Sequence, residues 1–257
     1  MDMQPMIQLI DLKKSFGSQL VLKGVNLSIY EGKTTVIVGE SGKGKSLLLK
    51  HILGLVKPDS GQVIVDGKDI NKISKRELKD IRADFGVLFQ NAALFDSMTV
   101  YDNVALPLCE RTDFSEEKIK DIVNEKLKLM DLEGSNEKYP AQLSGGMRKR
   151  VGLARALVLN PKIVFFDEPT TGLDVAKSNE IYRVFFRTQS KLRYTSLIVS
   201  HDVPKIFKLA DYVALLYEGI IQDCLPPEDF QTSENPTIRE FVEKTMGLIY
   251  ESELVEE

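Results

Sequence analysis

The chain has 257 residues, and its 34 Lys and Arg against 38 Asp and Glu give a net charge of −4, without the cationic excess that nucleic-acid binding normally needs. With 43% hydrophobic and 28% charged residues, the composition is that of a globular protein rather than a disordered or fibrous one. A chain this long buries roughly 75% of its unfolded surface, so it needs no disulfide or structural metal. We therefore expect one large α/β domain.

The two cysteines, Cys109 and Cys224, show no spacing typical of a zinc site or a redox motif. We interpret them as reduced thiols, with a disulfide as the alternative. The N-terminal residues lack the apolar stretch of a secretory signal, and no apolar run approaches the roughly 20 residues that cross a bilayer. We expect a cytoplasmic protein whose membrane role would depend on a partner.

The first third of the chain is rich in strand patterns, followed by a glycine-rich turn and one mostly buried helix. We predict strands over residues 6–12, 25–30, 33–38 and 61–67, and the helix over residues 45–56.

The middle of the chain changes to helical spacing. Residues 115–130 predict a helix with Ser115 as its N-cap, within a helical subdomain from about residue 91 to 160. Beyond it, apolar runs predict two central parallel strands and an edge hairpin, over residues 162–167, 195–200, 211–217 and 220–224. A further helix is predicted over residues 236–246, and the glutamate-rich end, 251–257, reads as a solvated tail.

Residues 39–46 read GESGKGKS and fit the phosphate-loop pattern G-x-x-x-x-G-K-[ST], between a predicted strand and a predicted helix. Glycines let successive N–H groups point at phosphate oxygens, and the helix presents its positive end. Lys45 would bridge the β- and γ-phosphates, and Ser46 would bind Mg²⁺. An incidental glycine-rich turn is the alternative. The predicted phosphate-binding residues are Gly39, Glu40, Ser41, Gly42, Lys43, Gly44, Lys45, Ser46 and Leu47.

Two acids close the apolar run that ends at Phe166. At the carboxyl end of a central strand, Asp167 can hold Mg²⁺, and Glu168 can deprotonate the water that attacks the γ-phosphate. An acidic pair alone would more often be a helix cap, but beside a phosphate loop it indicates nucleotide hydrolysis.

Residues 143–147 read LSGGM and precede a predicted helix over residues 148–159. Ser144, Gly145 and Gly146 would place a hydroxyl and bare N–H groups at a helix N-terminus, which makes a second anion site. A simple N-cap is the alternative.

From about residue 6 to about residue 224, these motifs together resemble the nucleotide-binding subunit of an ABC transporter. Four further matches stand in family order: Gln90 resembles the Q-loop, residues 171–174 (TGLD) the D-loop, residues 200–202 (SHD) the H-switch, and Phe16 the aromatic that stacks on adenine. The resemblance implies a P-loop NTPase fold, with a RecA-like core sheet, an inserted helical subdomain and an N-terminal antiparallel β subdomain. It also implies a head-to-tail homodimer in which Lys45 of one protomer and Ser144 of the other contact the same ATP.

The resemblance assigns roles that each have a plainer alternative. His201 would contact the γ-phosphate and the attacking water, yet a lone histidine at a strand end is more often structural. Gln90 would bind Mg²⁺ or water, yet it could be an ordinary surface residue. Phe16 would stack on adenine, yet it could belong to the core. Asp174 would pair across the dimer, yet it could equally cap the helix from residue 175.

Two positions depart from the common family pattern. Met147 stands where a glutamine usually ends the signature, and TGLD stands for SALD. Neither change removes a phosphate donor or the general base, so both are interpreted as subfamily marks. The segments FQNAALFDSMTVYDNVALPL, LSGGMRKRV and DEPTTGLD are most similar to the Mla-type phospholipid-transport ATPases that serve MCE-protein lipid transporters.

This resemblance implies several partners and a location. An apolar groove around residues 92–108 would receive a helix of an integral membrane permease, with an MCE-type lipid-binding protein in the same complex. The expected location is peripheral, on the cytoplasmic face of the inner membrane. We divide the chain into an ATPase domain over residues 1–225 and a C-terminal extension over 226–257, which could bind a small regulatory subunit or the second protomer, or cap the fold.

Three other functions remain to be weighed. The ATPase of a polar amino-acid importer would use nearly the same motifs. A soluble ABC ATPase acting on DNA or ribosomes usually has two such domains or a long coiled coil, neither of which is visible here. A nucleotide sensor without turnover is disfavoured by the intact Glu168 and His201.

Overall fold

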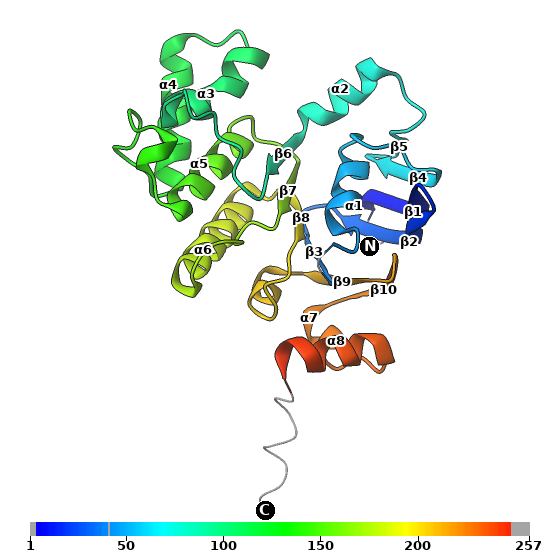
Figure 1. The fold of residues 1–257 in the computed structure, drawn as a ribbon. Coiled ribbons are helices and arrows are strands. Elements are labelled where there is room, and N and C mark those ends of the chain that lie inside the picture. The colour runs from blue at the N-terminus through cyan, green and yellow to red at the C-terminus, as the bar shows by residue number, and fades with distance from the viewer. Residues whose placement is uncertain (1–3, 41, 248–257) are drawn as a thin grey trace, which may run out of the picture. The chain divides into compact units, whose positions relative to one another are not determined.

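The computed structural model describes residues 4–40 and 42–247 and has an α/β architecture (Figure 1). The chain divides into two compact units, one formed by Met1–Ile73 with Val199–Glu257 and the other by Ser74–Ile198. We call them unit 1 and unit 2 and describe each by itself. The predicted acidic tail lies outside the described residues.

The N-terminal part of unit 1 is an antiparallel sheet with the strand order β2-β1-β4-β5. In β1, Ile7 and Leu9 are both buried, two residues apart, as expected of a strand with one face on a core, and the buried Leu12 follows a register shift in the pairing with β2. The first two strands are longer than predicted because they continue to a tight turn at Gly17, whose φ is 58°. The strands are β1 (Pro5–Phe16), β2 (Gln19–Tyr30), β4 (Ser60–Val65) and β5 (Lys68–Asp69).

Unit 1 also contains three strands of a second sheet. The fully buried β3 (Thr34–Val38) pairs in parallel with β9 (Tyr212–Tyr217), which pairs antiparallel with β10 (Ile220–Leu225). The predicted hairpin is confirmed, and Glu218 and Gly219 form its turn with φ of 48° and 85°. β3 is buried throughout, as expected of a parallel strand inside a sheet, whereas β10 is the last strand of its sheet and is only partly buried.

The helices of unit 1 follow β3 and β10. Helix α1 (Lys45–Ile52) ends four residues before the predicted end, because Gly54 takes a left-handed conformation, with φ of 66°, and its N–H bonds the His51 carbonyl. The predicted helix over residues 236–246 is confirmed as α8 (Pro236–Met246), capped by Asn235. The remaining helical elements are η2 (Lys205–Leu209) and α7 (Pro227–Gln231).

His51 of α1 makes the folded state sensitive to acid. Its side chain is fully buried; Nδ1 lies 2.9 Å from the Val56 carbonyl and Nε2 has no hydrogen-bond partner. Burial lowers the pKa of His51, with a smaller effect of Lys14 in the same direction, while the Val56 bond and Asp59 oppose it. Below pH about 6.5 the unfolded chain therefore binds more protons than the folded chain at this position.

We expect the free energy of unfolding to fall below pH about 6.5, by at most about 1.4 kcal/mol per pH unit from His51. Urea denaturation at pH 7.5 and pH 5.5 measures this fall. His51→Gln keeps a donor for Val56 but does not titrate, so its fall between the two pH values should be smaller. An equal fall in both proteins would show that other groups cause the acid sensitivity.

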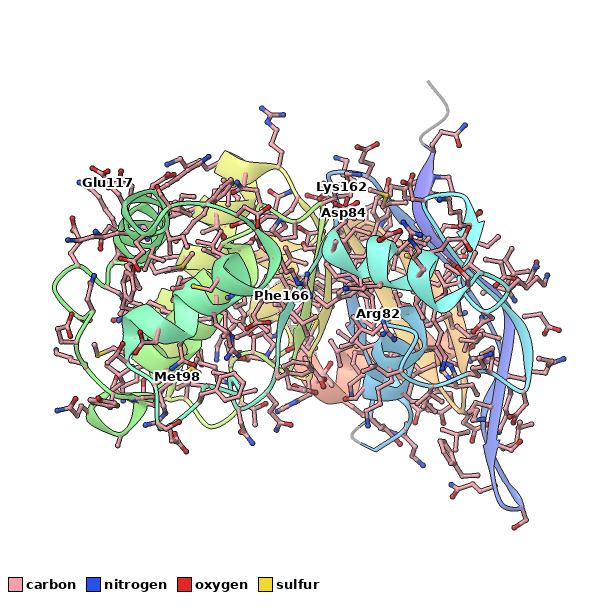
Figure 2. All side chains as sticks on the ribbon, turned by 90° about the horizontal axis from the view of Figure 1, so that it is seen from above. Arg82, Asp84, Met98, Glu117, Lys162 and Phe166 are labelled. Atoms are coloured by element: carbon pink, nitrogen blue, oxygen red, sulfur yellow. The ribbon has the colours of Figure 1, made fainter. Side chains whose placement is uncertain are left out.

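Unit 2 contains the strands β6 (Phe85–Leu88), β7 (Ile163–Asp167) and β8 (Thr195–Val199), with β7 between the other two. The predicted central strands are confirmed as β7 and β8, and β6 pairs with β7 in parallel. Side by side at the start of β6 and β7, Asp84 and Lys162 form an ion pair of 2.9 Å (Figure 2). Phe166 packs against Phe185 of α6 (Val175–Leu192), with ring centroids 4.4 Å apart.

The helices between β6 and β7 pack against one another in unit 2 (Figure 1). The predicted N-cap Ser115 is confirmed, since its side chain accepts from the Lys118 N–H. Helix α5 begins three residues before the predicted start, because Ser144 caps it and both glycines join its first turn. These helices are α3 (Val100–Arg111), α4 (Glu116–Leu129), η1 (Pro140–Gln142) and α5 (Gly145–Leu157), and α2 (Lys75–Ala83) precedes β6.

Cys109 and Cys224 are both free. Burial raises the pKa of the Cys224 thiol to about 11, with a further contribution from Asp223. Within residues 4–40 and 42–247, no helix is both long enough and apolar enough to span a bilayer.

Candidate functional site

The glycine-rich loop of unit 1 lies between β3 and α1, as the phosphate-loop pattern requires. Gly39, Gly42 and Gly44 have φ of 144°, 75° and 106°, values that side chains rarely adopt. A Cβ on Gly39 would lie 2.2 Å from the Leu216 carbonyl oxygen, so only glycine fits where the loop leaves β3. Ser41, a predicted phosphate-binding residue, lies outside the described residues.

The first turn of α1 suits an anion. Its N-cap is Gly44, no side chain caps it, and it holds no acidic residue. Helices α2 to α6 in unit 2, by contrast, all begin at a serine, threonine or aspartate whose side chain accepts a bond from the first turn. The helix dipole and the first N–H groups of α1 therefore favour a negatively charged ligand.

Lys45, the first residue of α1, bonds back to the start of the glycine-rich loop. Only 5% of the residue is exposed, and its Nζ donates to the carbonyls of Gly39 and Glu40 at 2.7 and 3.0 Å. A buried ammonium among main-chain groups provides the positive charge that phosphate oxygens require. Lys43 is exposed and lies 3.8 Å from the Glu40 carboxylate. The residues of the loop thus fit a triphosphate.

Phe16 lies at the end of β1 and is 55% exposed, so the alternative of a core phenylalanine is wrong. The strand end is held by Asp59, whose carboxylate accepts from the Ser15 N–H at 2.6 Å and from Lys14 Nζ at 2.7 Å. An exposed ring on a fixed strand end is available for stacking on a base.

The segment that contains His201 lies beside the phosphate loop within unit 1. The Ser200 N–H donates to the carbonyl of Ile37 at 3.2 Å, which fixes the segment at the end of β3, two residues before Gly39. The Asp202 N–H donates to Ser200 Oγ at 3.0 Å. The Asp202 carboxylate forms an ion pair with Lys205 Nζ at 3.5 Å. His201 is exposed.

In unit 2, Asp167 ends β7 and Glu168 follows it, and both are half-buried. Glu168 has a φ of 48°, which is unusual for a residue with a side chain. Such strain of about 1–3 kcal/mol is common at functional sites, because the surroundings impose it. The Thr171 hydroxyl lies 3.5 Å from Glu168 Oε2.

The LSGGM segment opens α5, and Ser144 is its N-cap, with Oγ accepting from the Met147 N–H at 3.3 Å. The N-cap alternative is therefore confirmed, and it remains compatible with an anion site, since the first turn of α5 has no acid. A Cβ on Gly145 would lie 3.1 Å from Leu173, so the LSGGM and TGLD segments are in close contact within unit 2. Asp174 caps α6 by accepting from the Lys177 N–H at 2.9 Å.

Sequence reasoning missed two basic residues of α5. Lys149 is 6% exposed and donates from Nζ to the main-chain carbonyl of Gln90, while Gln90 itself is exposed. Burial lowers the pKa of Lys149, and the Glu168 carboxylate acts in the opposite direction. Arg155 donates to the carbonyls of Ala92 and Ala93 at 2.7 and 2.8 Å.

The segment these cations hold is itself strained. Ala92 and Ala93 have φ of 58° and 47°, each at a penalty of about 1–2 kcal/mol for a residue with a Cβ. Gly152 of α5 allows the close approach, since a Cβ there would lie 3.1 Å from that of Ala92. Gly152, three residues after Lys149 in the same helix, was the available signal in the sequence.

The residues of the predicted groove over residues 92–108 differ in their exposure. Ala92, Val100, Val104, Ala105 and Leu108 are buried in the core of unit 2 and cannot receive a partner as they stand. Phe95 of the same stretch is 49% exposed, and Phe89, which precedes Gln90 and lies outside the predicted groove, is 43% exposed. Two large aromatic rings are therefore exposed near Gln90.

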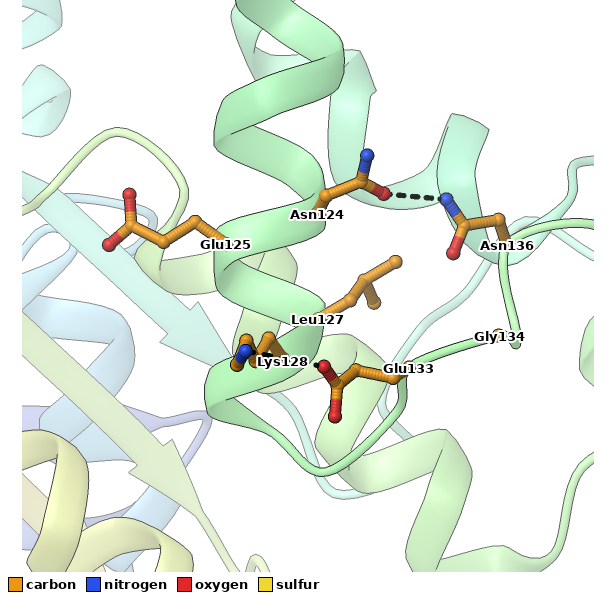
Figure 3. A pocket seen from close by; sticks show the side chains of 7 residues that line it. All are labelled: Asn124, Glu125, Leu127, Lys128, Glu133, Gly134 and Asn136. Carbon is orange, nitrogen blue, oxygen red and sulfur yellow. Dashed lines mark hydrogen bonds and ion pairs between the residues drawn. The ribbon is translucent and has the colours of Figure 1, made fainter.

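A separate hollow of about 460 Å³ lies between α4 and the loop that follows it (Figure 3). Its polar side chains pair with one another: Asn136 donates to Asn124 at 2.8 Å, and Lys128 lies 3.6 Å from Glu133. These pairs hold the loop against α4, and we assign the hollow no binding role.

A family model described as "ABC transporter" matches residues 22–171. The chain is 43% identical to the "Probable ribonucleotide transport ATP-binding protein mkl" of Mycobacterium leprae, over 94% of this chain and 70% of that protein. It is 38% identical to the "Intermembrane phospholipid transport system ATP-binding protein MlaF" of Haemophilus influenzae, over 89% of each. It is also 41% identical to the "Methionine import ATP-binding protein MetN" of Carboxydothermus hydrogenoformans, over 85% of this chain and 65% of that protein.

Solved structures agree with this match. The chain superposes on cbiO1 of Clostridium perfringens, part of the ABC transporter complex cbiONQ, with a TM-score of 0.82, 30% identity and coverage of 92% of this chain and 94% of that one. It superposes on the dimeric, post-hydrolysis ATP-binding cassette MJ0796 bound to ADP and Pi with a TM-score of 0.78 and 34% identity, over 86% and 99% of the chains. The chain therefore belongs to the ABC transporter family, as one of its ATPase subunits.

Proposed function

We propose that ATP binds in the 39–47 loop and that Glu168 deprotonates the attacking water. The observation that carries the proposal is the loop itself, with the buried Lys45 ammonium and the uncapped N-terminus of α1 converging on one anion-binding position. Phe16 would stack on the adenine, and His201, held beside the end of β3, would contact the γ-phosphate.

Ser46, Gln90 and Asp167 are proposed to hold Mg²⁺. Hydroxyl, amide and carboxylate oxygens are the ligands that this ion prefers, and the three side chains are exposed or half-buried. When bound, Mg²⁺ neutralises charge on the β- and γ-phosphates. The protein's own part is to orient the triphosphate along the loop and to keep the Glu168 carboxylate in place as a proton acceptor.

Two copies of the chain are proposed to form the complete site. The first turn of α5, with Ser144, Gly145 and Gly146, would contact the ATP held by Lys45 of the other protomer. Asp174 would contribute across the same interface. The dimeric state of the MJ0796 cassette supports this arrangement.

The transported substrate is proposed to be phospholipid, moved by an MCE-type complex at the cytoplasmic face of the membrane. The MlaF similarity supports this proposal, whereas the similarity to MetN keeps an amino-acid importer as the second candidate. The exposed Phe89 and Phe95 would contact the permease. Helix α8 and the rest of residues 226–257 are proposed as a C-terminal extension of the 1–225 ATPase domain.

Purifying the intact membrane complex through a tag on this chain tests the substrate. We expect a permease, an MCE-domain protein and bound phospholipid to copurify. As a control, a Phe89→Ser and Phe95→Ser double variant should keep ATPase turnover but lose the permease. Recovery of a periplasmic amino-acid-binding protein instead would replace the lipid proposal with the importer.

A further inference from the structure

Helix α5 holds the main chain of the segment that follows β6. Lys149 Nζ donates to the Gln90 carbonyl, and the Arg155 guanidinium donates to the Ala92 and Ala93 carbonyls at 2.7 and 2.8 Å. Three carbonyls among four successive residues are thus bonded to two cations of one helix. We call this arrangement the 90–93 clamp.

The buried charge of Lys149 needs a physical explanation. Lys149 is 6% exposed, and a buried ammonium is unfavourable compared with an apolar side chain of the same size unless its partners need it. Its partners here are the carbonyl of Gln90 and the nearby carboxylate of Glu168. Gln90 and Glu168 belong to two different motifs of the proposed hydrolysis site, which follow β6 and β7, and Lys149 bonds the main chain of the first of them.

We propose that Lys149 is a positioning residue for ATP hydrolysis: by holding the Gln90 carbonyl from helix α5, it fixes where the Gln90 side chain is placed for Mg²⁺ or the attacking water. The inference rests on the proposed role of Gln90. Arg155 supports the same segment from its other end, on the carbonyls of Ala92 and Ala93. Neither cation lies in the phosphate loop, so nucleotide binding does not depend on them.

The test compares Lys149→Met with a matched variant. Methionine fills the same volume without a charge or donor. Lys126 is the second buried lysine of unit 2, 3% exposed, and its Nζ donates to Asn160 Oδ1 at 2.7 Å rather than to the 90–93 segment. In the full chain with Mg-ATP, we expect Lys149→Met to lower kcat by about tenfold or more with KM changed by less than about twofold, whereas Lys126→Met keeps kcat.

A double-variant cycle with Gln90→Ala shows whether Lys149 acts through Gln90. Once the Gln90 side chain is absent, placing it no longer matters, so Lys149→Met should lower kcat less than about twofold further. Lys149→Arg, which keeps a charged donor, should recover most of the turnover. A purely structural role would give the same loss in both backgrounds, and that result would overturn the proposal.

The outcomes separate this inference from the proposed function. If Gln90→Ala leaves kcat unchanged, both the role of Gln90 and the inference fail. If Gln90→Ala lowers kcat but Lys149→Met does not, only the inference fails. Should Lys149→Met not fold, as judged by thermal unfolding, Lys149→Gln retains an uncharged donor; it should lower kcat in the wild-type background and again add little to Gln90→Ala, and additive loss would overturn the inference.

Discussion

Glu168→Gln should retain ATP binding, lose hydrolysis by about 10²-fold or more, and accumulate as an ATP-bound dimer. The amide has the same shape as the carboxylate but cannot accept a proton from the attacking water. Glutamine meets the same backbone strain at φ 48° as glutamate, so the substitution changes the chemistry without changing the local conformational penalty. The affinity for ATP depends on the 39–47 loop, which this substitution does not alter.

Steady-state turnover, nucleotide binding and gel filtration in Mg-ATP measure the three parts of this expectation. Glu133→Gln serves as the matched control, because Glu133 is an exposed glutamate of the same unit, and its carboxylate lies 3.6 Å from Lys128 Nζ. It should retain both turnover and the oligomeric state of the wild type. Unaltered turnover of Glu168→Gln would refute the general-base assignment, whereas loss of ATP binding would show that Glu168 supports the fold of the site.

The sheet was predictable from sequence because its central strands are unmistakable. The run that forms β7 is apolar at every position before Asp167, as strands covered on both faces must be. Helix α2 was not predicted, although Ser74 and Glu77 form a capping box, because none of its residues is buried and its sequence has no apolar stripe. Strand β6 was missed because four residues are too short for a period to show.

The motif residues were predictable from the sequence, but the residues that hold the motif segments in place were not. Lys45, Asp167 and Glu168 follow from local spacing, which sequence displays directly. The contacts of Lys149 and Arg155 do not, because they join residues 59 to 63 positions apart and use main-chain carbonyls that any residue type provides. Cations of this kind can be recognised only once the packing of α5 on β6 is known, which is why the sequence did not single out Lys149 or Arg155.

Gly39→Ala should destabilise unit 1 by about 3 kcal/mol or more and abolish ATP binding. Two effects combine at this position. The φ of 144° disfavours any side chain, and the added Cβ would meet the Leu216 carbonyl oxygen at 2.2 Å. Because Val38 and Leu215 are paired neighbours in β3 and β9, the clash can be relieved only by separating the two strands at the mouth of the phosphate loop.

Gly67→Ala isolates the backbone effect, since Gly67 also has a positive φ, 72°, but a Cβ there would have no neighbour within 4 Å. Urea denaturation should show a loss of only about 1 kcal/mol for this control, with ATP affinity unchanged. The difference between the two variants measures the steric contribution of the close approach to β9. Equal losses would mean that β3 and β9 can separate freely at Gly39, and a loop so loosely joined to the sheet could not hold Lys45 and the first turn of α1 on a triphosphate.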